Sequence, residues 1–211
     1  IKPGTDYARQ FPDQAPVDGT RIPRLADLFD LVKRSGDDKV RFDIETKINP
    51  DRPAEAPEPG VFARALVAEI RKAGVAARSV VQSFDWRTLQ VVQKIAPEIP
   101  TAYLTIQSRM DNIAAGRPEG SRWTAGFQHK DYGSVPKMIK AAGGACWSAY
   151  FGDLTPELAR EAQSLGLKVL AWTVNDPAAM ARMIDYGVDG LITDRPDLAR
   201  KLLEARGIRW R

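Results

Sequence analysis

A regular alternation of short apolar strands and amphipathic helices is the feature that most constrains the fold of this chain. From Val40 onwards, six apolar segments with the composition of strands alternate with segments whose apolar residues recur at helical spacing. Gly144, Gly166 and Gly187 each precede one of the last strands, at spacings of 22 and 21 residues. Strands buried on both faces and joined by helices form parallel sheets with right-handed crossovers. The sequence therefore predicts an α/β fold.

The expected elements follow one another in a fixed order. Strands are expected at 40–47, 79–84, 101–106, 144–148, 168–174 and 190–193. Helices are expected at about 24–34, around Phe62 to Ile70 with a stop at Gly74, around Trp86 to Val92, at 134–142, and from the starts Thr155-Pro156, Asp176-Pro177 and Pro196. Residues 107–133 are less regular.

Two closures of such a sheet are compatible with the pattern, an open doubly wound sheet and a (β/α)₈ barrel. The chain contains no G-x-G-x-x-G and no G-x-x-x-x-G-K-[ST] motif, one of which an open sheet normally carries after a strand. A barrel needs eight strands, so two units would lie outside this sequence or come from another chain. We expect residues 1–22, which are rich in Pro, Gly and Asp, to be an irregular N-terminal segment, and 23–211 to form a partial (β/α) barrel as a single domain.

Composition excludes several classes of protein. With 211 residues, 44% of them hydrophobic and 27% charged, the chain can bury one sizeable core. The net charge of +4 is spread along the sequence, so we do not expect nucleic-acid binding. No apolar run is long enough for a transmembrane helix. Cys146 is the only cysteine, expected as a small buried hydrophobic residue, and His129 is the only histidine.

The carboxyl ends of barrel strands are where active groups gather. At the end of the first expected strand, alternation places Asp43, Glu45 and Lys47 on one side and Phe42, Ile44 and Thr46 on the other. In a functional interpretation Glu45 ligates a hard divalent cation and Lys47 holds an anion such as phosphate. A surface strand in water, or an internal ion pair, is the alternative.

Residues at the ends of other expected strands also have both a functional and a structural interpretation. Ser83 touches a substrate or caps the following helix, and Trp172 lines a substrate pocket or belongs to the core. His129 lies in a polar irregular stretch, where we expect a solvated loop side chain. A single histidine and the absence of G-x-S-x-G argue against a Ser-His-Asp triad.

Four segments in this order resemble the glycerophosphodiester phosphodiesterase family: Arg41–Lys47, Val80–Asp85, Val169–Asn175 and Gly187–Pro196. The stretch Gly19–Leu25 is similar to the family's lead into its third barrel unit. The resemblance covers most of the chain and implies a TIM-type (β/α)₈ barrel that hydrolyses glycerophosphodiesters to an alcohol and glycerol 3-phosphate. It also implies a divalent cation, Ca²⁺ or Mg²⁺, and two histidines as acid and base. By the same resemblance Glu45 is a metal ligand, and Lys47, Phe84 and Trp172 bind the phosphate and the rest of the substrate.

The chain departs from the family in one large respect. The family's His-Arg-Gly, Pro-Glu-Asn and His-Asp segments, which carry both histidines and the other metal carboxylates, do not occur here. The catalytic residues are therefore not identified. We expect this chain to be the C-terminal part of the enzyme, with six of eight barrel units, and to be inactive and poorly stable alone unless it forms a homo-oligomer.

Two other functions remain open from the sequence. One is a degenerate barrel that binds a phosphorylated ligand through Lys47 without hydrolysis, and the other is a related lipid phosphodiesterase. The head group and the preferred cation are not predicted. The Pro-rich loops are similar to those of exported bacterial members, which favours a periplasmic location over a cytoplasmic one.

Overall fold

The structure of the chain is a computed structural model, which describes residues 5–9 and 14–208. Contacts between residues group the chain into two compact units, Ile1–Asp38 and Lys39–Arg211.

The first unit contains helices α1 (Asp6–Arg9) and α2 (Leu25–Ser35). Helix α2 begins after Arg24, whose backbone N–H donates to the Asp27 carboxylate at 3.0 Å, and ends at Gly36 in the left-handed region with φ of 71°. The helix expected at 24–34 is therefore confirmed. Helix α1 lies within the segment expected to be irregular, and a domain boundary after residue 22 stays a prediction.

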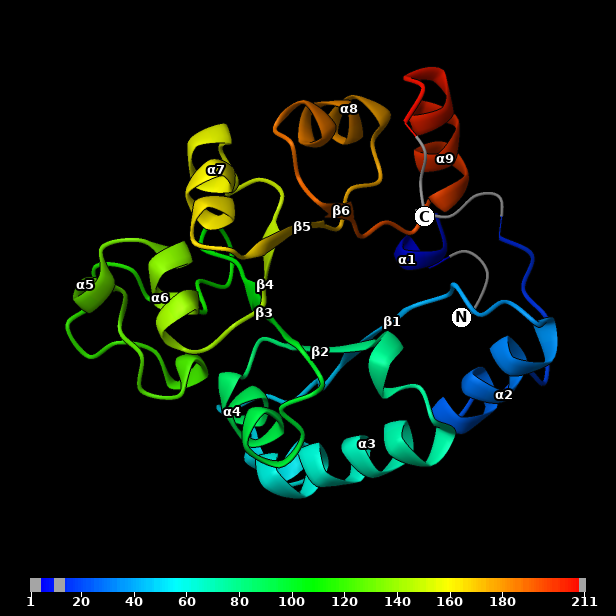
Figure 1. Cartoon of the computed structure of the whole chain (residues 1–211), viewed down its shortest axis with the longest axis horizontal. Helices are drawn as coiled ribbons and strands as arrows, with labels where there is room; N and C mark the ends of the chain where they lie inside the picture. The colour runs from blue at the N-terminus through cyan, green and yellow to red at the C-terminus, as the bar shows by residue number, and fades with distance from the viewer. Residues whose placement is uncertain (1–4, 10–13, 209–211) are drawn as a thin grey trace. The chain divides into compact units, whose positions relative to one another are not determined.

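The second unit is built on one parallel sheet whose strands follow each other in sequence order, as expected for consecutive βα units. Its strands are β1 (Phe42–Glu45), β2 (Ser79–Ser83), β3 (Thr101–Thr105), β4 (Cys146–Tyr150), β5 (Lys168–Trp172) and β6 (Gly190–Leu191). The sheet curves into a half-barrel (Figure 1). The described residues thus provide six strands of a barrel, whereas closure by eight units is not seen.

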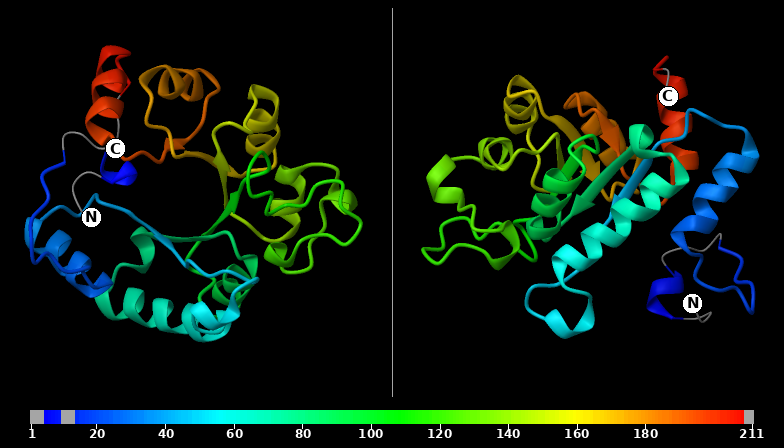
Figure 2. Two further views of the ribbon diagram at one scale, coloured as in Figure 1. Left: turned by 180° about the vertical axis from the view of Figure 1, so that it is seen from behind. Right: turned by 60° about the horizontal axis from the view of Figure 1, so that its bottom comes forward.

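Helices cover the convex side of this sheet, as two further views show (Figure 2). They are α3 (Pro59–Ala73), α4 (Trp86–Ile95), α5 (His129–Tyr132), α6 (Val135–Ala141), α7 (Pro156–Ser164), α8 (Pro177–Asp185) and α9 (Pro196–Ala205). Three 3₁₀ turns lie in the connections: η1 (Pro53–Glu55), η2 (Ala76–Arg78) and η3 (Arg122–Thr124). In the part of the chain that the structure describes, no helix is long and apolar enough to cross a membrane.

The helix starts expected from cap-plus-proline pairs are confirmed. The Thr155 hydroxyl accepts from the N–H of Leu158 at 3.3 Å, and the Asp176 carboxylate accepts from Ala179 at 2.8 Å. In each case proline follows at the first helical position, where it has no hydrogen bond to lose. These local signals fix where α7 and α8 begin.

Several local expectations differ from the structure: the strands expected at 40–47, 168–174 and 190–193 are shorter, as the bounds of β1, β5 and β6 show. The fourth strand was expected at 144–148 but runs from Cys146 to Tyr150. Gly144 instead closes the end of α6, because its N–H donates to Ile139 O at 3.0 Å and a Cβ at this position would lie 2.6 Å from the Ile139 side chain. His129 is not in an irregular loop: it is half-buried and begins the four-residue helix α5.

The core lies between the convex face of the sheet and these helices. Trp86 of α4 and Tyr103 of β3 are fully buried and meet edge to face, with ring centroids 4.7 Å apart. Val81 of β2 and Ile70 of α3 are also fully buried. The concave face carries both polar and apolar residues, since Ser148 is paired in the ladder with Leu104 and Leu170.

Candidate functional site

The concave face of the sheet carries the acidic residues of β1. Thr46, just after β1, contacts Thr88 of α4 through the two hydroxyl oxygens at 2.7 Å, which places it on the helix side. Gln82, paired in the ladder with Glu45, accepts from the Ser148 hydroxyl at 3.3 Å although their strands are not adjacent. Side chains on that face therefore converge. The predicted alternation along β1 is confirmed.

A cavity of about 530 Å³ opens at the carboxyl ends of the strands. The four residues predicted for the site all line it: Glu45, Lys47, Phe84 and Trp172. They follow or end three different strands, β1, β2 and β5, so the curvature of the sheet brings them together. The further lining residues are Thr46, Ile48, Asn49, Glu55, Ala56, Ile106, Arg109, Met110 and Trp123. The structure places the predicted residues in one cavity, and their chemical roles stay predictions.

Glu45 is one of two carboxylates that line this cavity, the other being Glu55. The Glu45 side chain is half-buried, and its Oε1 atom has no hydrogen-bond partner among the described residues. Burial raises the pKa of Glu45, and the nearby charge of Lys47 partly opposes this rise. A buried carboxylate oxygen without a donor is costly, so this atom is suited to accept a cation or a ligand hydrogen.

Asp43 lies two residues before Glu45 on the same face. Its side chain is accessible to solvent, yet the protein atoms around the carboxylate displace enough water to raise its pKa to about 7. The negative charge of Glu45 adds to this increase. Asp43 does not line the cavity.

The fit of these residues to a metal ion is partial. Within residues 5–9 and 14–208, no group of three or more His, Cys, Asp or Glu side chains could hold a metal ion. Calcium takes about six to eight oxygen ligands, so one carboxylate cannot form a complete site. Glu45, with its unpartnered oxygen, fits the role of a single ligand.

Aromatic rings form one wall of the cavity. Phe84 meets Trp172 edge to face with centroids 5.3 Å apart, and meets Trp123 in the same way at 6.5 Å. The indole N–H of Trp172 donates to Ser148 O at 2.9 Å, which fixes the ring. Of the two alternatives for Trp172, the structure supports the pocket position.

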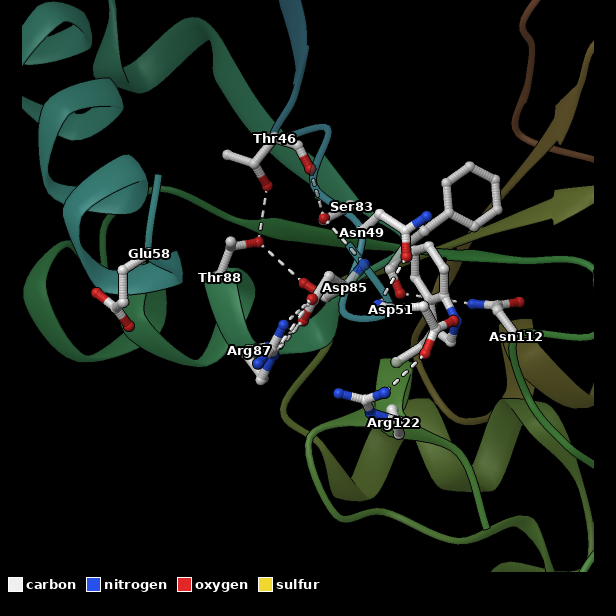
Figure 3. Close-up of polar contacts among 12 residues, drawn as sticks. Thr46, Asn49, Asp51, Glu58, Ser83, Asp85, Arg87, Thr88, Asn112 and Arg122 are labelled. Atoms are coloured by element: carbon white, nitrogen blue, oxygen red, sulfur yellow. Dashed lines mark hydrogen bonds and ion pairs between the residues drawn. The ribbon is translucent and has the colours of Figure 1, made fainter. Parts of the chain in front are cut away.

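Ser83 has a structural position. Its hydroxyl donates to Thr46 O at 2.7 Å and accepts from the Asp85 N–H at 3.1 Å (Figure 3). The Thr88 hydroxyl donates to Asp85 O at 3.0 Å, and all four residues are fully buried. This network joins the end of β1 to the end of β2 and the start of α4. It therefore fixes the backbone next to Lys47 and Phe84, which directly follow Thr46 and Ser83. Ser83 does not line the cavity.

The loop after β3 supplies cavity residues that the sequence did not predict. Arg109, Met110 and Trp123 lie within the stretch 107–133, where no periodicity marks which side chains face a site. Arg122 of the same loop pairs with Asp51 at 3.0 Å and thereby ties this loop to the one after β1 (Figure 3). Only the unusual presence of Arg, Met and Trp in a polar stretch could have indicated these positions.

Comparisons with known proteins agree with the geometry. The model of the glycerophosphoryl diester phosphodiesterase family matches residues 4–198. The chain is 28% identical over 189 residues to a glycerophosphodiester phosphodiesterase of Caldanaerobacter subterraneus, covering 90% of this chain and 65% of that protein. It is 30% identical over 189 residues to a protein of Mycobacterium tuberculosis assigned the same activity, covering 90% and 62%. The chain therefore spans less than two thirds of the length of these relatives.

Solved structures show the same fold. A protein from Silicibacter pomeroyi assigned as a glycerophosphoryl diester phosphodiesterase superposes with a TM-score of 0.81 at 37% identity, covering 98% of this chain and 65% of that one. A phosphodiesterase from Oleispira antarctica, solved with the product sn-glycerol 3-phosphate, superposes with a TM-score of 0.62 at 16% identity, covering 87% and 62%.

Proposed function

The chain belongs to the glycerophosphoryl diester phosphodiesterase family, and we propose that the protein containing it hydrolyses glycerophosphodiesters to an alcohol and glycerol 3-phosphate. One observation carries this proposal: a single cavity at the carboxyl edge of the sheet gathers a carboxylate, a lysine and aromatic rings from three strand ends. The complex of the Oleispira relative with sn-glycerol 3-phosphate supports it, because the proposed product is the same compound.

Each predicted residue has a role that suits its chemistry. The ammonium group of Lys47, a compact point charge, binds a phosphate oxygen. Phe84 and Trp172, held edge to face at 5.3 Å, offer a rigid apolar surface to the carbon atoms of the glycerol group. Their positions in one cavity support these roles together.

We assign Glu45 as one ligand of a divalent cation, Ca²⁺ or Mg²⁺. Its unpartnered, half-buried oxygen supports this role. A bound cation supplies neutralisation of the negative charge on the phosphate oxygens. Glu45 alone is too few for such a cation, so the site needs further oxygen ligands besides it.

The acid and base of the reaction are expected from outside this chain. His129, the single histidine, is not among the residues that line the cavity. General acid–base catalysis typically contributes about 10²–10⁴-fold to a rate. We therefore propose that the 211-residue chain is inactive by itself and that two further βα units complete an eight-stranded barrel. Separately, on the Pro-rich loops, we propose that the protein is periplasmic. Its oligomeric state is left open.

The test is an assay of the full-length protein for release of glycerol 3-phosphate from glycerophosphodiesters. We expect activity with added Ca²⁺ or Mg²⁺ and its loss with EDTA. Glu45→Gln should reduce activity by more than the roughly 10- to 100-fold that removal of an indirect metal partner costs. Glu98→Gln is the control, because Glu98 is exposed and pairs with Arg71 at 2.7 Å away from the cavity.

The outcomes separate the candidate functions. Full activity in the 211-residue chain alone would contradict the proposed need for further units. Binding of phosphate without any hydrolysis in the full-length protein would contradict the enzyme and support a degenerate binding barrel. Hydrolysis restricted to another class of phosphodiester lipid would contradict the proposed substrate.

A further inference from the structure

Arg109 is a second cationic residue of the cavity, besides Lys47. Its guanidinium carbon lies 5.5 Å from the centroid of the Tyr150 ring, at the end of β4. The Tyr150 ring in turn packs against Trp172 with centroids 5.4 Å apart. This stack of three side chains holds Arg109 beside the tryptophan wall, where a cation over an aromatic face is stabilised.

The charge of Arg109 is not neutralised by the part of the chain that the structure describes. No carboxylate there lies within ion-pair distance of its guanidinium. Two other arginines of the same loop are paired: Arg117 with Asp111 at 3.4 Å and Arg122 with Asp51 at 3.0 Å. Arg109 differs from both because it faces the cavity with its N–H donors available.

The backbone that carries Arg109 is anchored on its N-terminal side. The Asp153 carboxylate, from the loop after β4, accepts from the N–H groups of Gln107 at 2.7 Å and Ser108 at 3.2 Å. One step earlier, the side chain of Asn112 accepts from the Ile106 N–H at 2.8 Å and donates to Leu104 O at 3.0 Å. Because these bonds already fix the backbone before Arg109, less loop freedom is lost when the arginine binds a ligand.

We propose that Arg109 binds a phosphate oxygen of the substrate, alongside Lys47. This inference rests on the proposed function and adds a specific anion-binding residue from the loop after β3. A guanidinium presents a planar set of donors that matches phosphate and can form two parallel hydrogen bonds. Lys47 and Arg109 together then compensate the phosphate charge from two loops that line the cavity, the one after β1 and the one after β3.

The experiment is isothermal calorimetry on the full-length protein, with sn-glycerol 3-phosphate and inorganic phosphate as separate probes. A hydrogen bond between charged groups predicts that Arg109→Met weakens binding of both probes by about 10- to 100-fold. Arg109→Lys should recover part of the lost affinity, because lysine restores the positive charge but not the planar set of donors of the guanidinium. Arg117→Met is the control: it removes the same charge from the same loop, at a side chain that does not line the cavity, and should leave both dissociation constants unchanged. Thermal unfolding of each variant establishes that the fold is intact.

The other outcomes are decisive as well. If Lys47→Met abolishes binding while Arg109→Met does not change it, the role of Arg109 is overturned and the proposed function stands. If Arg109→Met leaves both dissociation constants unchanged but lowers the release of glycerol 3-phosphate from the intact diester, the phosphate assignment is wrong and Arg109 contacts another part of the substrate. If neither probe binds to the wild-type protein, the role of Arg109 is overturned, and the assay of glycerol 3-phosphate release decides the proposed function separately.

Discussion

Glu45 and Asp43 show how two carboxylates on one strand can lie in different surroundings. Both have a pKa above the ordinary value, mainly because protein atoms replace water around them. Glu45 lines the cavity, and one of its carboxylate oxygens has no hydrogen-bond donor in the described chain. Asp43 lies two residues earlier on the same strand and does not line the cavity. Glu45 is therefore suited to a ligand, and Asp43 is a group whose ionisation opposes folding.

Asp43→Asn tests this assignment through stability. A pKa raised to about 7 means that the folded state holds the proton more tightly than the unfolded state. The stability from this group is present below the ordinary pKa near 4 and is lost as pH rises through about 7. Asparagine does not titrate, so the free energy of unfolding should fall by about 1 kcal/mol less in the variant than in the wild type over this pH range. This value is kept small because Asp43 is accessible to solvent, which screens its charge.

The measurement is urea unfolding at pH 5 and pH 8, with EDTA present. Asp131→Asn, at an exposed residue of α5, is the control. An identical pH dependence in the wild type and Asp43→Asn would show that the carboxylate ionises freely in the folded protein.

At the scale of single residues, sequence prediction succeeded where geometry follows from the chain itself. Glu45 and Lys47 share a face because strand side chains alternate, and Trp172 ends a strand whose carboxyl end meets theirs. Arg109 and Trp123 were not predicted because they lie in a loop without periodicity. Their positions depend on tertiary bonds, such as that from Asp153 to Gln107.

At the scale of elements, the junction of β1, β2 and α4 determines the shape of the site. Ser83, fully buried, joins the backbone oxygen of Thr46 to the N–H of Asp85, which caps α4. The sequence left open whether Ser83 touches substrate or caps the helix. Neither alternative describes it completely, since the hydroxyl bridges two strand ends.

Ser83→Ala should destabilise the fold by about 1–3 kcal/mol, because two buried backbone groups lose their partner. Chemical denaturation measures this change. Ser164→Ala is the matched control, because the Ser164 hydroxyl bonds only to Glu161 O on the exposed end of α7, and it should change stability by less than about 0.5 kcal/mol. Equal effects of the two substitutions would contradict the bridging role.

Element boundaries followed from the sequence wherever a local signal fixed them. The starts of α7 and α8 were predicted from a capping residue followed by proline. The start of β4 was misplaced by two residues because a glycine that ends a helix resembles one that begins a strand, and only the contact with Ile139 distinguishes them. Helix α5 is one turn long and gives no periodic signal.

At the scale of the whole molecule, six parallel strands in sequence order form half of a barrel with its concave face and strand ends equipped for a ligand. Families with this fold place their chemistry at the carboxyl ends of the strands. The fold class followed from the alternation of elements, whereas closure of the sheet by eight units stays a prediction, because the described residues form six strands. The cavity at these strand ends gathers a carboxylate, two cationic side chains and an aromatic wall.

A crystal structure of the full-length protein with sn-glycerol 3-phosphate and Ca²⁺ or Mg²⁺ tests the central claim most directly. We predict phosphate oxygens within hydrogen-bond distance of Lys47, the glycerol carbons against Trp172, and a carboxylate oxygen of Glu45 bound to the cation. A ligand bound outside this cavity, or a Glu45 carboxylate turned away from both cation and phosphate, would contradict the account.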